Sequence, residues 1–65
     1  MVYREIDKLL RKNGWVLTRT TGSHFQYKHI DIIYIATVPN HGKKDISIGV
    51  IRSLEKVTGL SFLKR

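Results

Sequence analysis

The chain has 65 residues, with 12 lysines and arginines against five acidic residues, a net charge of +7, and no cysteine. A chain of this length forms one small domain, here residues 1–65, and buries only about 60% of its unfolded surface. The lack of cysteine excludes disulfides and thiolate zinc sites, so a binding partner is one plausible source of extra stability. The 42% hydrophobic content predicts a folded domain and excludes a disordered basic tail.

The basic excess favours a partner that carries negative charge. Nucleic acid is the first candidate; the alternatives are an acidic protein and a surface that is merely solvated. Residues 1–5 lack the apolar core of a signal peptide, and the longest apolar run, residues 32–36, is too short to cross a membrane. We therefore expect a cytoplasmic protein.

Residues 3–13 predict a short amphipathic helix. Ile6 and Leu10 follow helical spacing, and basic side chains occupy the opposite side. Asn13 and Gly14 supply the stop, because glycine readily takes the left-handed conformation at a helix end.

Three strands are predicted next. Residues 15–20, 24–29 and 32–38 are rich in aromatic and β-branched side chains, and the turns between them are short. Pro39 ends the third strand, because proline lacks the donor that a ladder requires. For Trp15 two roles are open: an anchor of the core against the first helix, and a platform on which a base stacks.

A second helix is predicted after a polar loop at residues 40–45. Ser47 suits the N-cap, and Ile46 and Ile51 are placed for a hydrophobic staple. Gly59 closes the helix. The predicted apolar stripe contains Ile48, Ile51 and Leu54, with Val57 as a further candidate, and residues 60–65 are expected to form a short basic tail.

The order α-β-β-β-α predicts an α+β fold with two helices on one face of a three-stranded antiparallel sheet. In the second strand, Phe25 and Tyr27 alternate toward the core, where we expect the tyrosine hydroxyl to reach water. His24, Gln26 and Lys28 alternate toward the other face, which the helices leave open.

His24 is the main candidate for chemistry, because histidine gives or takes a proton near neutral pH. Two interpretations are open. It is either a surface histidine bonded to a neighbour, or a general acid or base acting on the 2′-hydroxyl or the leaving 5′-oxygen of RNA. Gly22 and Ser23 precede it directly, and their backbone N–H groups and hydroxyl would hold a phosphate.

Four other side chains are candidates for support. His41 is a second acid or base, a phosphate contact, or a loop histidine that orients its turn. Lys28, Lys43 and Lys44 are candidate phosphate contacts, with a solvated surface as the alternative. The three histidines match no standard zinc spacing, so we predict no metal, and no other cofactor is expected.

The chain resembles the HicA toxins, a family of small bacterial and archaeal toxins of type II toxin–antitoxin systems. The segments that carry the resemblance are residues 14–15 (GW), 22–24 (GSH), 38–42 (VPNHG) and 51–54 (IRSL). Two departures are the turn at residues 29–31, where the family often has Pro-Asp-Gly, and Asn40, where it often has an apolar residue.

The resemblance implies a fold like that of a double-stranded RNA-binding domain, and a ribosome-independent mRNA interferase. The resemblance also implies that the protein is an endoribonuclease in which the histidine of GSH, His24, is catalytic. A HicB-type antitoxin would cover or obstruct the His24 region, so we expect a monomer alone and a hetero-oligomer with the antitoxin. The competing hypotheses are a non-catalytic RNA-binding module of the same fold and an interaction domain for an acidic protein.

Overall fold

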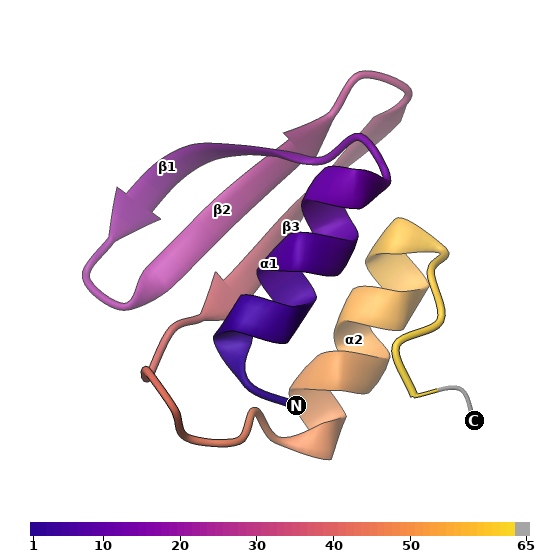
Figure 1. Cartoon of the computed structure of the whole chain (residues 1–65). Coiled ribbons are helices and arrows are strands. Elements are labelled where there is room, and N and C mark those ends of the chain that lie inside the picture. Colours follow the sequence, from indigo (N-terminus) through magenta and orange to yellow (C-terminus); the bar gives the residue numbers. More distant parts are fainter. Residues whose placement is uncertain (64–65) are drawn as a thin grey trace.

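The computed structural model describes residues 1–63 and contains two helices and three strands. In chain order they are α1 (Tyr3–Lys12), β1 (Val16–Thr21), β2 (His24–His29), β3 (Ile32–Pro39) and α2 (Ile48–Thr58). The strands form one antiparallel sheet in the order β1-β2-β3. Figure 1 shows α1 lying across the sheet with α2 beside it, next to the edge strand β3. The predicted α-β-β-β-α architecture is confirmed.

The end of α1 is set by its glycine. Asn13 is the C-cap, and Gly14 takes a φ of +90°. A Cβ atom at position 14 would lie 2.9 Å from Nε2 of His29. Glycine is therefore required here for its backbone conformation and also for the close approach of a side chain from β2.

The start of α2 confirms Ser47 as the N-cap, because its Oγ accepts a hydrogen bond from the N–H of Val50 at 3.4 Å. Ile46 and Ile51 are both buried in the core. The predicted stripe is wrong at Ile48, which is 58% exposed. Ile46 already fills the core at this end of the helix, so the side chain two residues later is left in solvent.

The segment after α2 returns to the core, which contradicts the predicted basic tail for residues 60–63. Phe62 is buried, and its N–H donates to Oε2 of Glu55 at 2.8 Å. Leu60 and Leu63 pack against the core beside it. Residues 60–63 carry three apolar side chains and no basic one, so they bury against the core; the two basic residues, 64 and 65, lie outside the described part of the chain.

The core lies between the helices and one face of the sheet. Trp15 is only 2% exposed, which confirms it as a core anchor and excludes its use as a stacking platform. Phe25 packs its ring against that of Tyr3, with centroids 5.1 Å apart. The buried apolar residues are Ile6, Leu10, Trp15, Tyr27, Ala36, Val38, Ile46, Ile51, Leu54 and Phe62.

The hydroxyl of Tyr27 does not reach water, contrary to the prediction. It donates a hydrogen bond to Oδ1 of Asp7 at 2.5 Å and lies 2.5 Å from the hydroxyl of Tyr3. Burial, together with the hydrogen bond to Asp7, raises the pKa of Tyr27 above its usual value. Strand alternation correctly predicted that the ring of Tyr27 faces the core. It could not predict the acceptor of the hydroxyl, because Asp7 belongs to α1 and not to the sheet.

Acid should destabilise the protein through Asp7. Burial tends to raise the pKa of this carboxyl, but hydrogen bonds from Tyr27 and Arg11 outweigh burial and hold the pKa below its usual value. A carboxyl with a lowered folded-state pKa stabilises the fold above its unfolded pKa of about 4 and loses that effect as the pH falls through the folded value. Melting temperatures measured from about pH 6 to pH 2 should therefore fall less steeply for Asp7→Asn, which starts from a lower value. Equal slopes for the wild type and the variant would contradict this, and Asp31→Asn, at an exposed turn, is the control.

Candidate functional site

His24 lies at the first position of β2, directly after a tight turn. Gly22 in that turn has a φ of +59°, and nothing lies within 4 Å of where its Cβ would be, so conformation alone requires glycine. His24 pairs with Thr21 of β1 and with Pro39 of β3, and its side chain is exposed. The predicted placement of the imidazole away from the core is confirmed.

The fold joins the segment before His24 to the segment that carries His41. The N–H of Asn40 donates to the carbonyl of Ser23 at 2.7 Å, where β3 ends beside the start of β2. The next residues form a turn in which the N–H of Gly42 donates to Oδ1 of Asn40 at 3.1 Å. Two motifs that are distant in the sequence thus become neighbours.

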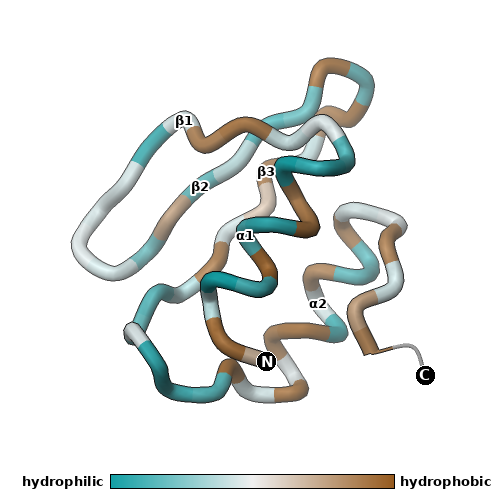
Figure 2. The backbone as a smooth tube through the Cα atoms, viewed as in Figure 1, coloured by the Kyte–Doolittle hydropathy of each residue, from teal (hydrophilic) through white to brown (hydrophobic). Residues whose placement is uncertain are grey.

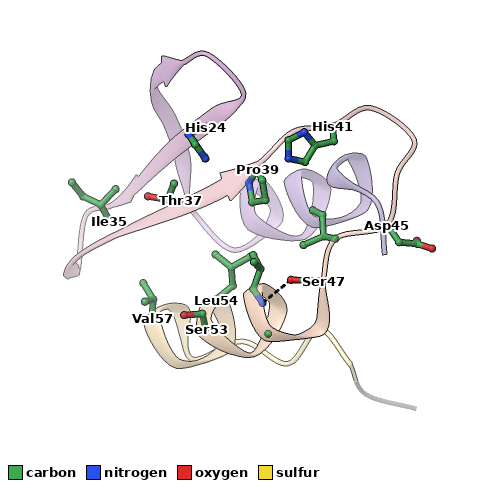
Figure 3. Close-up of a pocket in the computed structure, with 13 residues that line it drawn as sticks. His24, Ile35, Thr37, Pro39, His41, Asp45, Ser47, Ser53, Leu54 and Val57 are labelled. Atoms are coloured by element: carbon green, nitrogen blue, oxygen red, sulfur yellow. Dashed lines mark hydrogen bonds between the residues drawn. The ribbon is translucent and has the colours of Figure 1, made fainter.

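His24 and His41 line one groove of about 730 Å³ between β3 and α2. Figure 3 shows the two rings on either side of Pro39, with Leu54 and Val57 of α2 across the groove. The strand wall includes Ile35 and Thr37, so the groove combines apolar walls with two imidazole rings at one end. Such a site can hold an organic group and transfer a proton to it.

Two lysines lie in the loop between His41 and Asp45, which both line the groove. Lys43 and Lys44 are exposed in the hydrophilic loop between β3 and α2 that Figure 2 shows. The carboxylate that lines the groove, Asp45, is held at 3.3 Å by the N-terminal ammonium of Met1. Within the described chain, none of the five acidic residues lies in a strand, so the sheet face around His24 carries no negative side chain.

Lys28 lies on the open face but far from His24. It pairs with Val16 of β1, and the pairing of β2 with β3 is irregular at this point. Lys28 follows His24 by four steps along an extended strand, a distance of about 13 Å. Lys28 is thus too far from His24 to contact the same phosphate. It could contact a different phosphate of a bound RNA, unlike Lys43 and Lys44, the other two predicted contacts.

His29 points to the core side and has a structural role. Its ring packs on Trp15 with centroids 5.2 Å apart. The N–H of Asp31 donates to Nδ1 at 3.0 Å, so Nε2 carries the proton and donates to the carbonyl of Asn13 at 3.1 Å. Within residues 1–63, no group of three or more histidine or acidic side chains is placed to bind a metal.

Sequence reasoning missed one basic residue on the open face. Arg19 is exposed and pairs with Gln26 of β2, beside His24. Strand alternation predicts that Arg19 shares the core face with Leu17, two residues earlier. A β-bulge at Thr18 changes the face, and nothing in the sequence marks its position.

The fold and this groove define a small basic α+β domain with the layout of a double-stranded RNA-binding domain. The family model described as the HicA toxin of bacterial toxin–antitoxin matches residues 3–60, a range that contains all five elements. The chain therefore belongs to the HicA toxin family, and it is the toxin of a toxin–antitoxin system with a cognate antitoxin as partner.

A search of curated proteins returned no match. No helix within residues 1–63 has the length and apolar character that crossing a membrane requires.

Proposed function

We propose that the protein is an endoribonuclease that cleaves mRNA independently of the ribosome and uses His24 as its catalytic residue. The observation that carries the proposal is the position of this imidazole, exposed at the end of a groove beside a carboxylate-free sheet face. Membership of a toxin family supports it, because cleavage of mRNA would stop growth.

The expected reaction is an attack of the 2′-hydroxyl oxygen on the adjacent phosphorus. A bond forms between that oxygen and phosphorus, the bond to the 5′-oxygen breaks, and the products are a 2′,3′-cyclic phosphate and a 5′-hydroxyl. One proton leaves the 2′-hydroxyl and one reaches the 5′-oxygen. His24 would transfer one of these protons, a role that contributes about 10²- to 10⁴-fold in rate.

The surroundings of His24 suit the other requirements of this reaction. The backbone N–H groups at Gly22 and Ser23 and the ammonium groups of Lys43 and Lys44 would stabilise charge on the phosphorane. His41 lines the same groove and is the candidate for the second proton transfer. The apolar walls would hold the adjoining nucleotide.

We further propose that a HicB-type antitoxin neutralises the protein by obstructing this groove in a hetero-oligomer, and that the toxin alone is a monomer in the cytoplasm. The net charge of +7 suits a partner that presents acidic side chains to the same surface that binds RNA.

The proposal is tested by incubating the purified protein with end-labelled single-stranded RNA in EDTA. We expect cleavage with a 2′,3′-cyclic phosphate end, identified by mass, and no cleavage of DNA. A matched RNA with 2′-deoxyribose at the cut site should stay intact, because the attacking hydroxyl is missing.

Cleavage of the 2′-deoxy RNA would exclude the 2′-hydroxyl route. Binding of RNA without cleavage would instead support the non-catalytic RNA-binding module. That module would recognise shape and backbone through phosphate and 2′-hydroxyl contacts.

A further inference from the structure

We propose that Arg19 binds the phosphate on which His24 acts, and that the β-bulge at Thr18 turns the guanidinium toward it. The inference rests on the proposed function, because it assigns a phosphate contact to the same site. It adds a residue on β1, which lies on the side of His24 away from the groove. The phosphate would then lie between Arg19 and the groove.

The bulge is what moves Arg19 to this face. In a regular strand, Leu17 and Arg19 would point the same way, and Leu17 packs against the core opposite Tyr27. The register instead shifts at the bulge. Leu17 pairs with Tyr27, and the next pair is Arg19 with Gln26, so two residues of β1 correspond to one residue of β2. The extra residue, Thr18, donates from Oγ1 to the carbonyl of Gln26 at 3.2 Å, which stabilises the irregular pairing.

The register also brings Arg19 within reach of His24. Gln26 follows His24 by two residues on β2, so both side chains belong to the open face. Arg19, opposite Gln26, is then the diagonal neighbour of His24. Diagonal neighbours lie roughly 7–8 Å apart, a separation that long side chains span.

The charge of Arg19 is free for a ligand. The side chain is exposed, and within residues 1–63 neither of the two salt bridges includes it. Arg11 offers a contrast, since Asp7 accepts from its Nε at 2.8 Å and compensates its charge. A free guanidinium donates two parallel hydrogen bonds to a phosphate, a geometry that lysine does not match.

The decisive variant is the transposition Arg19→Thr/Thr20→Arg. It keeps the composition and the net charge but moves the guanidinium to the other face, because Thr20 pairs with Phe25. Thr20 is exposed, so the face it occupies has room for a longer side chain. Arg19→Gln and Arg19→Lys complete the series, and Arg4→Gln, an exposed arginine on α1, is the matched control.

Two quantities are measured for each variant: the single-turnover cleavage rate, and the salt dependence of binding to the 2′-deoxy RNA. We expect Arg19→Gln and the transposition to slow cleavage on the order of 10²-fold and to lower the salt slope by about one. Arg19→Lys should recover part of the rate, and Arg4→Gln should match the wild type. Thermal melting of every variant checks that it is folded.

A transposed variant with wild-type rate and salt slope would overturn the inference, as would equal effects of Arg19→Gln and Arg4→Gln. A rate loss that accompanies a lower melting temperature and that lysine does not recover would assign Arg19 a structural role instead. If the wild type binds RNA without cleaving it, the proposed function fails while the salt slope still decides the role of Arg19. A wild type that neither binds nor cleaves RNA would overturn both.

Discussion

Replacing His24 by alanine should slow RNA cleavage by about 10²- to 10⁴-fold and leave the protein folded. The imidazole is exposed at the start of β2, and within residues 1–63 no hydrogen bond to its ring contributes to the fold. Its removal therefore takes away a proton-transfer group and little packing energy. Single-turnover rates at saturating enzyme, with thermal melting of the same samples, measure both effects.

His29→Ala is the matched control for that variant, because it should show the opposite pattern. The ring of His29 bridges the end of α1 to the turn after β2, and its loss should lower stability by about 1–2 kcal/mol. Cleavage by the folded fraction should stay near that of the wild type. Equal cleavage by wild type and His24→Ala, purified in parallel, would assign the activity to another residue or to a contaminant.

Trp15→Ala should strongly lower the free energy of unfolding. Removing a buried tryptophan costs about 3–5 kcal/mol. A domain of this length has a free energy of unfolding of about 3–10 kcal/mol, so the substitution removes from about a third to all of that stability. Trp15 also supports the ring of His29, so its loss weakens the junction between α1 and the sheet.

Urea unfolding followed by circular dichroism measures this effect. Val16→Ala is the control, because the neighbouring side chain is 58% exposed and should change stability by no more than about 0.5 kcal/mol. A Trp15→Ala variant that unfolds at the same urea concentration as the control would contradict the role of Trp15 as the anchor of the core.

The elements and the orientation of His24 were predictable because each depends on a local signal. Helical spacing, the glycine after α1 and the serine before α2 mark the helices. Short turns force antiparallel neighbours, and strand alternation then places His24 opposite to Tyr27. These features require only residues that are close in the sequence.

The remaining features depend on contacts between distant segments. The proximity of His24 and His41 depends on the hydrogen bond from Asn40 to Ser23, and the face of Arg19 depends on a bulge. A bulge is a property of two paired strands, so the pattern of one strand does not reveal it. The buried hydroxyl of Tyr27 was missed for the same reason, since its acceptor comes from α1.

The groove also has a consequence for the timing of toxicity during synthesis. One of its walls belongs to α2, the last of the five elements to leave the ribosome, while His24 is made much earlier. A nascent chain that already exposes the histidine still lacks the α2 wall of the groove. Under the proposed function, the chain therefore gains activity only after α2 has left the ribosome and packed beside β3.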